Sequence, residues 1–351
     1  MRERLPLALL GAGWVVRMGY LPHLMYGPFE VISIYDPDAD TVEALLPKLP
    51  RARVDSSVQS CLKAPALATL IASPSPSHVK LSLEALRAGR YVLCEKPVAV
   101  RRSQARKLAR VERESFRRLV GAAVCRHRPD IKQWISWCTR LNDIKRLDLI
   151  WLRAQGVPSP GSWHTRLSNG WTGVLVDLGY HLIDLAVAVL KRPVQAIRCL
   201  RARAVSTGEG AGASWYGPKS LTKYAVCDRV EARLQVDEVE INIQVAWVDD
   251  TPGDITQLIA TGSDGVAEFK GLLGFSNQRR IAEQKCRLLR GGEAVEEKSY
   301  LPGPDLHRGA FGGVLEEFAG VCRGAEPQVG LTQISAATAL IEAVNLAAEK
   351  Q

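Results

Sequence analysis

Three ionisable side chains, Asp177, His181 and Asp184, stand in a segment that is otherwise almost entirely apolar. Residues three and four apart share one face of a helix, so a helix here would point all three side chains the same way. A histidine beside carboxylates can serve as a general acid or base, because its pKa lies near neutrality and a carboxylate can fix its tautomer. The alternative is a helix whose only polar stripe happens to consist of these residues.

The first residues of the chain follow the order of a dinucleotide-binding unit, in which a strand leads through a glycine turn into a helix. Gly11 permits a tight turn, and Gly13 lets backbone N–H groups at the helix N-terminus approach a pyrophosphate. We assign Trp14 and Val15, which follow directly, to the same cofactor site. Val16 stands where the glycine fingerprint has a third Gly or Ala.

An acidic residue ends the second expected strand. Asp36 follows Phe29–Tyr35 and lies 23 residues (36 − 13) beyond Gly13, where a carboxylate is expected to accept the hydroxyls of the adenosine ribose. A carboxylate there repels a 2′-phosphate, so we expect NAD rather than NADP. The alternative is that Asp36 is an ordinary turn residue before Pro37.

Strands and helices alternate through the first third of the chain and predict a doubly wound parallel sheet. The expected strands are 5–10, 29–35, 53–54, 67–72 and 91–93, with helices at 39–49 and 79–88. Ligands bind at the carboxyl ends of such strands, which places two groups of residues at the cofactor site. They are Ser73, Pro74 and His78 after one strand, and Glu95 and Lys96 after another. The alternative for Lys96 is a surface lysine paired with Glu95.

Beyond residue 120 the pattern changes to strands joined by turns rich in Gly, Pro and Asp. The expected strands are 146–154, 231–248, 257–261, 266–270 and 285–289, and an amphipathic helix closes the chain at 333–350. With 351 residues, two domains are expected. We divide the chain into a cofactor domain at 1–122, a substrate and oligomerisation domain at 123–330, and a C-terminal helix at 331–351 that packs back on the first domain.

Composition excludes several classes of protein. Hydrophobic residues make up 46% and charged residues 24%, as in ordinary globular proteins, and the eight cysteines lack the clustered spacing of a disulfide framework or a zinc site. We therefore predict free thiols, no metal and a cytoplasmic protein. The net charge of +9 comes from basic residues that are spread along the chain and are densest at 101–118, where apolar residues at helical spacing favour a solvated helix face over a nucleic-acid site. The apolar stretch at 174–190 carries too many charges to span a membrane.

Four elements in this order resemble the glucose–fructose oxidoreductase / inositol dehydrogenase / MocA family. They are Gly11-Ala-Gly13 with Tyr20-Leu-Pro22, Ser73-Pro-x-x-x-His78, Glu95-Lys96-Pro97, and Asp177-x-Gly-x-His181-x-x-Asp184. The resemblance implies an α/β protein, with an N-terminal Rossmann domain and a C-terminal α+β domain built on an open, mostly antiparallel sheet. It also implies a homodimer or homotetramer that assembles through this sheet.

The resemblance also implies roles for single residues. Lys96 matches the active-site lysine, Asp177 the substrate-binding carboxylate and His181 the catalytic histidine, while Asp184 either orients His181 or caps local polar groups. The further expected substrate contacts are Arg126, Trp163, His164, Trp171 and Tyr180. Trp171 stands among residues that are often glycines in the family, and His127 replaces a common aromatic residue, so both bear on substrate identity.

These residues predict an NAD-dependent oxidoreductase acting on a hydroxyl-bearing carbon of a sugar, aminosugar, nucleotide sugar or cyclitol. His181 would be the acid/base, and Lys96 and Asp177 would assist it. One alternative is a non-catalytic nucleotide-binding sensor or scaffold of the same fold, which would be expected to lack this set. The other is a nucleic-acid binder, which only the net charge suggests.

Overall fold

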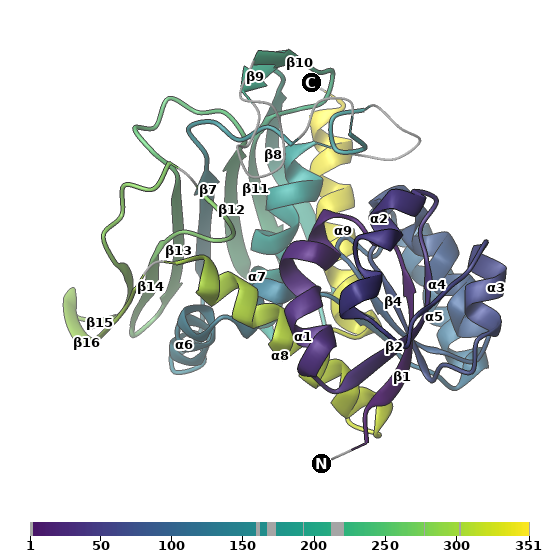
Figure 1. Cartoon of the computed structure of the whole chain (residues 1–351). Coiled ribbons are helices and arrows are strands. Elements are labelled where there is room, and N and C mark those ends of the chain that lie inside the picture. Colours follow the sequence, from purple (N-terminus) through teal and green to yellow (C-terminus); the bar gives the residue numbers. More distant parts are fainter. Residues whose placement is uncertain are drawn as a thin grey trace. The chain divides into compact units, whose positions relative to one another are not determined.

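The computed structural model in Figure 1 describes most of the chain. The described residues are 3–158, 162–166, 173–191, 193–211, 221–276, 278–301 and 303–350. The chain forms two compact units, the first made of Met1–Val124 and Arg308–Ser335, the second of Cys125–His307 and Ala336–Gln351. The domain boundaries expected after residues 122 and 330 stay predictions.

The first unit contains a six-stranded parallel sheet with strand order β3-β2-β1-β4-β5-β6, which confirms the predicted Rossmann fold. The strands are β1 (Leu5–Leu10), β2 (Phe29–Tyr35), β3 (Arg53–Val54), β4 (Ala68–Ile71), β5 (Tyr91–Cys94) and β6 (Leu119–Gly121). The order reverses between β1 and β4. In open sheets of this kind, ligands bind beyond the carboxyl ends of the strands at that reversal.

The helices that connect these strands are α1 (Leu21–Tyr26), α2 (Ala39–Glu43), α3 (Val58–Lys63), α4 (His78–Arg87) and α5 (Arg102–Ser115). Most of α8 (Pro304–Cys322), which comes much later in the chain, belongs to the same unit. The helix expected at 39–49 is shorter than predicted, because α2 ends at Glu43 and a 3₁₀ turn follows at Leu46–Lys48. Pro47 lacks the N–H that would continue the helical ladder and disfavours helical backbone at the residue before it.

Two apolar layers stabilise this sheet. Residues of α3, α4 and α5 form one buried cluster with the strands, and Val329 and Ile334 join it. In the other layer, Phe29 of β2 stacks on Phe318 of α8 at 5.2 Å between ring centroids. Gly19 also packs against α8, where an added Cβ would lie 2.7 Å from the ring of Phe311. A larger residue at position 19 would therefore displace this helix.

The second unit contains an eight-stranded sheet with order β16-β15-β14-β13-β7-β12-β11-β8. The strands are β7 (Arg146–Leu152), β8 (Ile197–Val205), β11 (Arg229–Val236), β12 (Val239–Ala246), β13 (Ile255–Gly262), β14 (Gly265–Gly271), β15 (Gln284–Arg290) and β16 (Glu293–Tyr300). β7 and β12 run parallel, and the other neighbouring pairs are antiparallel, as expected. A separate hairpin consists of β9 (Glu209–Ala211) and β10 (Leu221–Lys223).

Two strand predictions in this unit need correction. The run 231–248 is not one strand, because Asp237 adopts a φ of +51° and turns the chain from β11 into β12. The sequence analysis also assigned no strand to the sheet edges β8 and β16. Seven of the eight residues of β16 are exposed, so its sequence lacks the alternation that a half-buried strand shows.

Helices α6 (Pro129–Cys138) and α7 (Tyr180–Leu190) lie on one side of the eight-stranded sheet (Figure 1). Trp134 of α6 is fully buried, and its indole N–H donates to the carbonyl oxygen of Ala267 in β14 at 3.1 Å. The closing helix α9 (Leu331–Ala348) is long and apolar enough to cross a membrane by length and composition alone. Core helices pass the same test, and Leu340, Ile341 and Val344 of α9 are buried.

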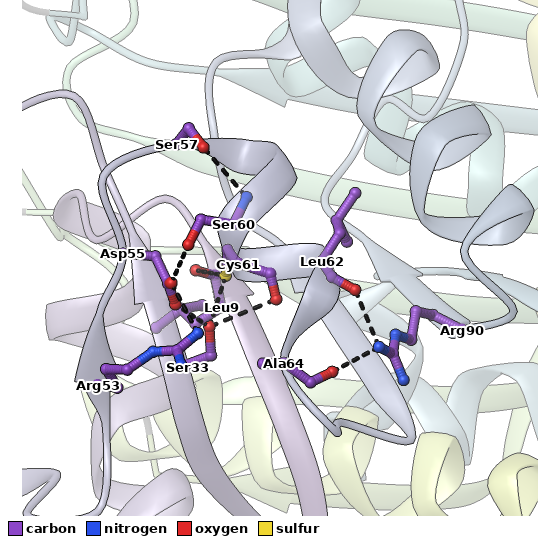
Figure 2. A network of polar contacts seen from close by, with 10 residues as sticks. All are labelled: Leu9, Ser33, Arg53, Asp55, Ser57, Ser60, Cys61, Leu62, Ala64 and Arg90. Carbon is purple, nitrogen blue, oxygen red and sulfur yellow. Dashed lines mark hydrogen bonds and ion pairs between the residues drawn. The ribbon is translucent and has the colours of Figure 1, made fainter.

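A buried polar network ties β2 to α3 near the carboxyl end of β2 (Figure 2). The carboxylate of Asp55 accepts hydrogen bonds from the hydroxyls of Ser33 and Ser60 and from the guanidinium of Arg53. Burial opposes the ionised carboxylate, but these three donors outweigh it and lower the pKa of Asp55. The ionised Asp55 therefore holds the loop after β3 in place.

All eight cysteines are free, as predicted. Five of them are buried: Cys61, Cys94, Cys125, Cys138 and Cys286. Burial raises the pKa of Cys61 to about 11, and the hydroxyl oxygen of Ser33 lies 3.0 Å from its sulfur. Cys61, Cys94, Cys138 and Cys286 pack as apolar side chains in the two cores.

Replacing Asp55 with Asn should lower the free energy of unfolding at pH 7 by about 1–3 kcal/mol, because three donors lose a charged acceptor. The pKa of Asp55 is lower in the folded chain than in the unfolded chain, so its contribution is present above the unfolded pKa and is lost as the pH falls through the folded pKa. Urea unfolding of both proteins should give a difference that shrinks below about pH 4. Exposed Asp250→Asn is the control, and a difference independent of pH would contradict this account.

Candidate functional site

The turn after β1 has the shape that a dinucleotide pyrophosphate requires. Gly11 has a φ of +102°, and a Cβ on it would lie 2.6 Å from the carbonyl carbon of Ala72. A Cβ on Gly13 would meet no atom within 4 Å, so the missing side chain leaves open space beside the turn. Helical bonding starts here, because the N–H groups of Val16 and Arg17 donate to the carbonyl oxygen of Gly13. A phosphate can therefore approach the backbone at a helix N-terminus.

The other residues of this turn lie around the same helix start. Trp14 and Val15 are half-buried, and their role at the cofactor stays a prediction. Val16, which departs from the glycine fingerprint, is fully buried and begins a π-helical turn that ends at Tyr20. π-Helical turns often occur at functional sites, where the extra residue redirects the following side chains.

Asp36 is fixed beside this turn by two backbone donors. Its Oδ2 accepts the N–H of Ala12 at 2.7 Å, and its Oδ1 accepts the N–H of Asp38 at 2.9 Å. Asp36 is therefore a turn residue, as in the alternative interpretation, but it is also held next to the glycine turn. A carboxylate has about four acceptor positions, so these two bonds are compatible with further donors such as ribose hydroxyls.

His78 links the two loops that follow β4 and β5. Its Nδ1 lies 2.8 Å from the carbonyl oxygen of Pro97, and its Nε2 lies 2.7 Å from that of Ser73. Burial lowers the pKa of His78, while both carbonyl contacts favour its charged form. These contacts hold the loop after β4 beside the loop after β5, and the place of His78 at the cofactor site stays a prediction. Pro74 is the residue before the 3₁₀ turn Ser75–Ser77, which lies between Ser73 and His78.

Glu95 is a buried carboxylate next to Lys96. Its Oε1 accepts the hydroxyl of Tyr20 at 2.7 Å, and its Oε2 accepts the backbone N–H of Lys96 at 3.0 Å. Burial raises the pKa of Glu95, and the Tyr20 hydroxyl and the Lys96 charge partly oppose this rise. Burial together with Glu95 raises the pKa of Tyr20 well above its usual value. Glu95 thus fixes the backbone from which the Lys96 side chain extends.

In the second unit, a π-helical turn precedes α7 and carries Asp177. The turn spans Leu175–Gly179, and the chain enters it at Gly173, whose φ is +88°. A Cβ on Gly173 would lie 2.6 Å from the carbonyl oxygen of Cys227, which accepts the N–H of Val174. Because a π turn adds a residue to the helix, Asp177 does not follow the spacing of an ordinary α-helix. The expectation that Asp177, His181 and Asp184 point the same way stays a prediction.

His181 lies beside a thiol and an aromatic ring. Its Nδ1 is 3.6 Å from the sulfur of Cys125, and its ring is 5.8 Å from that of Trp151 between centroids. When Nδ1–H donates to this sulfur, Nε2 carries the lone pair that a general base requires. Only 8% of the His181 surface is exposed.

Asp184 pairs with Arg126. The carboxylate accepts two hydrogen bonds, from Nε and Nη2 of Arg126, both at 2.7 Å, and the same Nη2 donates to the Asp184 carbonyl oxygen. Both side chains are buried. Of the two roles left open for Asp184, the ion pair with Arg126 supports the capping of local polar groups, and a neighbour of His181 Nδ1 is the sulfur of Cys125. The choice between the two roles stays a prediction. The substrate role of Arg126 stays a prediction.

The remaining expected substrate contacts are only partly described. Trp163 and His164 stack on each other at 3.6 Å between ring centroids, and Tyr180 is buried beside His181. Trp171 lies outside the described residues. His127 lies in a 3₁₀ turn that precedes α6. Within the described part of the chain, no group of three His, Cys, Asp or Glu side chains is arranged to hold a metal ion.

Residues 6–121 match the sequence profile of the Gfo/Idh/MocA group, described as an oxidoreductase family with an NAD-binding Rossmann fold. The Rossmann domain of the chain belongs to this family. Gfo/Idh/MocA proteins include dehydrogenases that act on sugar CH–OH groups. The chain is thus an NAD(P)-dependent oxidoreductase.

Several proteins that resemble this chain are named for an activity. The putative UDP-kanosamine synthase oxidoreductase subunit of Amycolatopsis mediterranei is 28% identical over 277 residues, covering 78% of this chain and 76% of that protein. D-glucoside 3-dehydrogenase of Escherichia coli is 29% identical over 66% of each chain. The structure of levoglucosan dehydrogenase with NADH and levoglucosan has a TM-score of 0.77 at 16% identity, and the match covers 99% of this chain and 98% of that chain.

Three contacts in this Gfo/Idh/MocA protein were not foreseen from sequence. They are the bond from Tyr20 to Glu95, the contact of Cys125 with His181, and the bond from Trp247 to Asp177. Tyr20 and Cys125 lie 75 and 56 residues from their partners, and Trp247 lies 70 residues from its partner. The sequence indicates only that a buried tyrosine or tryptophan requires a hydrogen-bond partner for its O–H or N–H, and it does not identify that partner.

Replacing Asp184 with Asn should destabilise the second unit by about 3–5 kcal/mol, because the guanidinium of Arg126 would remain buried without its counter-ion. The pH dependence of turnover should stay that of the wild type in the protein that remains folded. Thermal unfolding and a pH–rate profile measure the two effects. If Asp184→Asn instead shifts the pH profile at unchanged stability, Asp184 orients His181 and the ion-pair assignment is wrong.

Proposed function

We propose that this protein is an NAD-dependent dehydrogenase of a sugar, aminosugar, nucleotide sugar or cyclitol. The observation that carries the proposal is the position of His181, a buried imidazole that contacts a thiol and follows the turn bearing Asp177. A relative that only senses nucleotides would not require a titratable ring there. The names of relatives that act on glucosides, levoglucosan and a UDP-sugar support the substrate class.

The residues divide the reaction between them. Oxidation of a carbinol removes a hydride from carbon and a proton from oxygen, and the nicotinamide supplies the hydride chemistry when it is bound. We propose that His181 takes the proton at Nε2 while Cys125 accepts Nδ1–H, which stabilises the imidazolium that forms. Asp177 would accept a hydrogen bond from a neighbouring hydroxyl. The Lys96 ammonium would stabilise negative charge on the reacting oxygen.

The cofactor residues of the first unit favour NAD. Solved structures that match this chain contain NAD(H) or NADP. Asp36 places a carboxylate where a 2′-phosphate would require a positive or neutral group. Gly11, Gly13 and Asp36 would hold the pyrophosphate and ribose, and His78 and Glu95 would hold the loops around them. We also propose a cytoplasmic homodimer or homotetramer assembled through the eight-stranded sheet.

A panel of sugars and cyclitols tests the proposed activity, with NADH formation followed by absorbance. D-glucose, levoglucosan, myo-inositol and UDP-sugars should each be supplied with NAD and with NADP. We expect at least one panel member to be oxidised with NAD. Binding of NADH without turnover of any member would support the sensor or scaffold instead.

Replacing His181 with Ala should reduce kcat by about 10²–10⁴, because each lost proton transfer typically contributes that factor. The affinity for NADH should stay within a few-fold of wild type, since His181 belongs to the second unit and the glycine turn to the first.

Replacing Lys96 with Met removes the ammonium but keeps most of the apolar stem, so this variant should also have a reduced kcat/KM at a nearly unchanged melting temperature. Unfolding, or unchanged activity per folded molecule, would show that these residues are structural.

Replacing Asp36 with Ala should weaken NADH binding and reduce the preference for NADH over NADPH. The variant loses acceptors for ribose hydroxyls and the repulsion of a 2′-phosphate. Fluorescence titration of both cofactors with both proteins measures the ratio of dissociation constants. A wild-type protein that binds NADPH more tightly than NADH would show that the ribose assignment of Asp36 is wrong.

A further inference from the structure

Trp247 is a buried tryptophan whose only polar atom contacts Asp177. It follows β12 directly, none of its surface is exposed, and its indole N–H donates to Oδ2 of Asp177 at 3.0 Å. An indole has one donor and no acceptor, so this bond uses its whole hydrogen-bonding capacity. The Asp177 side chain itself is half-buried. A rigid, buried donor therefore holds one oxygen of a carboxylate that still reaches the surface.

The backbone and the ring of Trp247 are fixed from two sides. The backbone N–H of Trp247 donates to the carbonyl oxygen of Asp228 at 2.8 Å. The ring of Tyr224 meets the indole edge-on, at 6.5 Å between centroids and 89° between planes. A tryptophan held in this way cannot follow the carboxylate if Asp177 rotates.

A second buried carboxylate fixes Tyr224 in turn. Asp228 is fully buried, and its Oδ2 accepts the hydroxyl of Tyr224 at 2.6 Å and the N–H of Thr207 at 2.8 Å. The neighbouring carbonyl of Cys227 accepts the N–H of Val174, at the entry to the turn that carries Asp177. The segment 224–228 therefore supports both Trp247 and the turn on which Asp177 stands.

We propose that Trp247 is a positioning residue for substrate binding, which orients the Asp177 carboxylate by holding Oδ2 so that Oδ1 can accept a substrate hydroxyl. This inference rests on the proposed role of Asp177 in binding a sugar or cyclitol. A carboxylate with one oxygen held in place loses less rotational freedom when it binds a hydroxyl. Trp247 thus acts through Asp177, without touching the substrate itself.

Replacing Trp247 with Phe keeps an aromatic ring and removes the donor. We expect KM for the best substrate of the panel to rise about 10- to 100-fold, the range for loss of a hydrogen bond to a charged group, while kcat falls less. The dissociation constant for NADH should change less than twofold. Trp134→Phe is the matched control, because it also removes a buried indole donor, but one that binds the carbonyl oxygen of Ala267 and not Asp177, so its KM should stay within about twofold of wild type.

A double-mutant cycle separates positioning from general damage. If Trp247 acts through Asp177, Trp247→Phe should have little further effect on KM in an Asp177→Ala background. Effects that multiply in the double variant would overturn the inference. If Asp177→Ala alone leaves KM unchanged, the proposed substrate role of Asp177 fails, and the inference that depends on it fails with it.

A measurement on the wild-type fold covers the case in which Trp247→Phe does not fold. The indole N–H proton of Trp247 should give an NMR signal that is protected from exchange with solvent. Asp177→Ala should shift this signal and increase its exchange at least tenfold, because the bond to Oδ2 is lost. A signal that is insensitive to Asp177→Ala would overturn the inference.

Discussion

The buried ion pair between Arg126 and Asp184 is the constraint on which the arrangement of the second unit depends. Its two short bonds join the 3₁₀ turn at Val124–His127 to the middle of α7. Removing two charges from water is costly, and only close hydrogen-bonded geometry compensates for it. The pair therefore admits one relative placement of these segments. Cys125 and His181 lie on the same two segments, so their contact follows from the ion pair.

The first unit is organised in a comparable way, with polar clamps between loops instead of an ion pair. Glu95 holds Tyr20 from the helix after β1, and His78 holds the carbonyl groups of Ser73 and Pro97. Each clamp joins loops that follow different parallel strands. The loops beyond the carboxyl ends of parallel strands are not paired with one another through backbone hydrogen bonds. Side-chain hydrogen bonds such as these therefore fix the conformation of the loops. The network of Asp55 serves the outer strands β2 and β3 in the same way (Figure 2).

Sequence patterns were sufficient for the features that depend on local chemistry. Apolar runs ending in glycine, aspartate or the Glu95-Lys96-Pro97 triplet located β1, β2, β3 and β5, and the run before Ser73 located β4. The short strand β6 was missed. Asp36 follows β2 as expected, and its bond to Ala12 was not foreseen. The edge strands β8 and β16 were missed because few of their side chains are buried, so their sequences lack the apolar alternation of a half-buried strand. The partner of Asp184 was missed because Arg126 lies 58 residues away and nothing local marks it as the counter-ion.

The distribution of the thiols makes the stability of each unit separately observable. Cys61 and Cys94 lie in the core of the first unit, and Cys138 and Cys286 in that of the second. Burial raises the pKa of all four thiols, so very little thiolate is present at neutral pH while the native packing holds. A disulfide reagent reacts with such a side chain only after the surrounding structure opens. Mass spectrometry of the labelled peptides would therefore resolve the opening rate of each half of the molecule without any engineered probe.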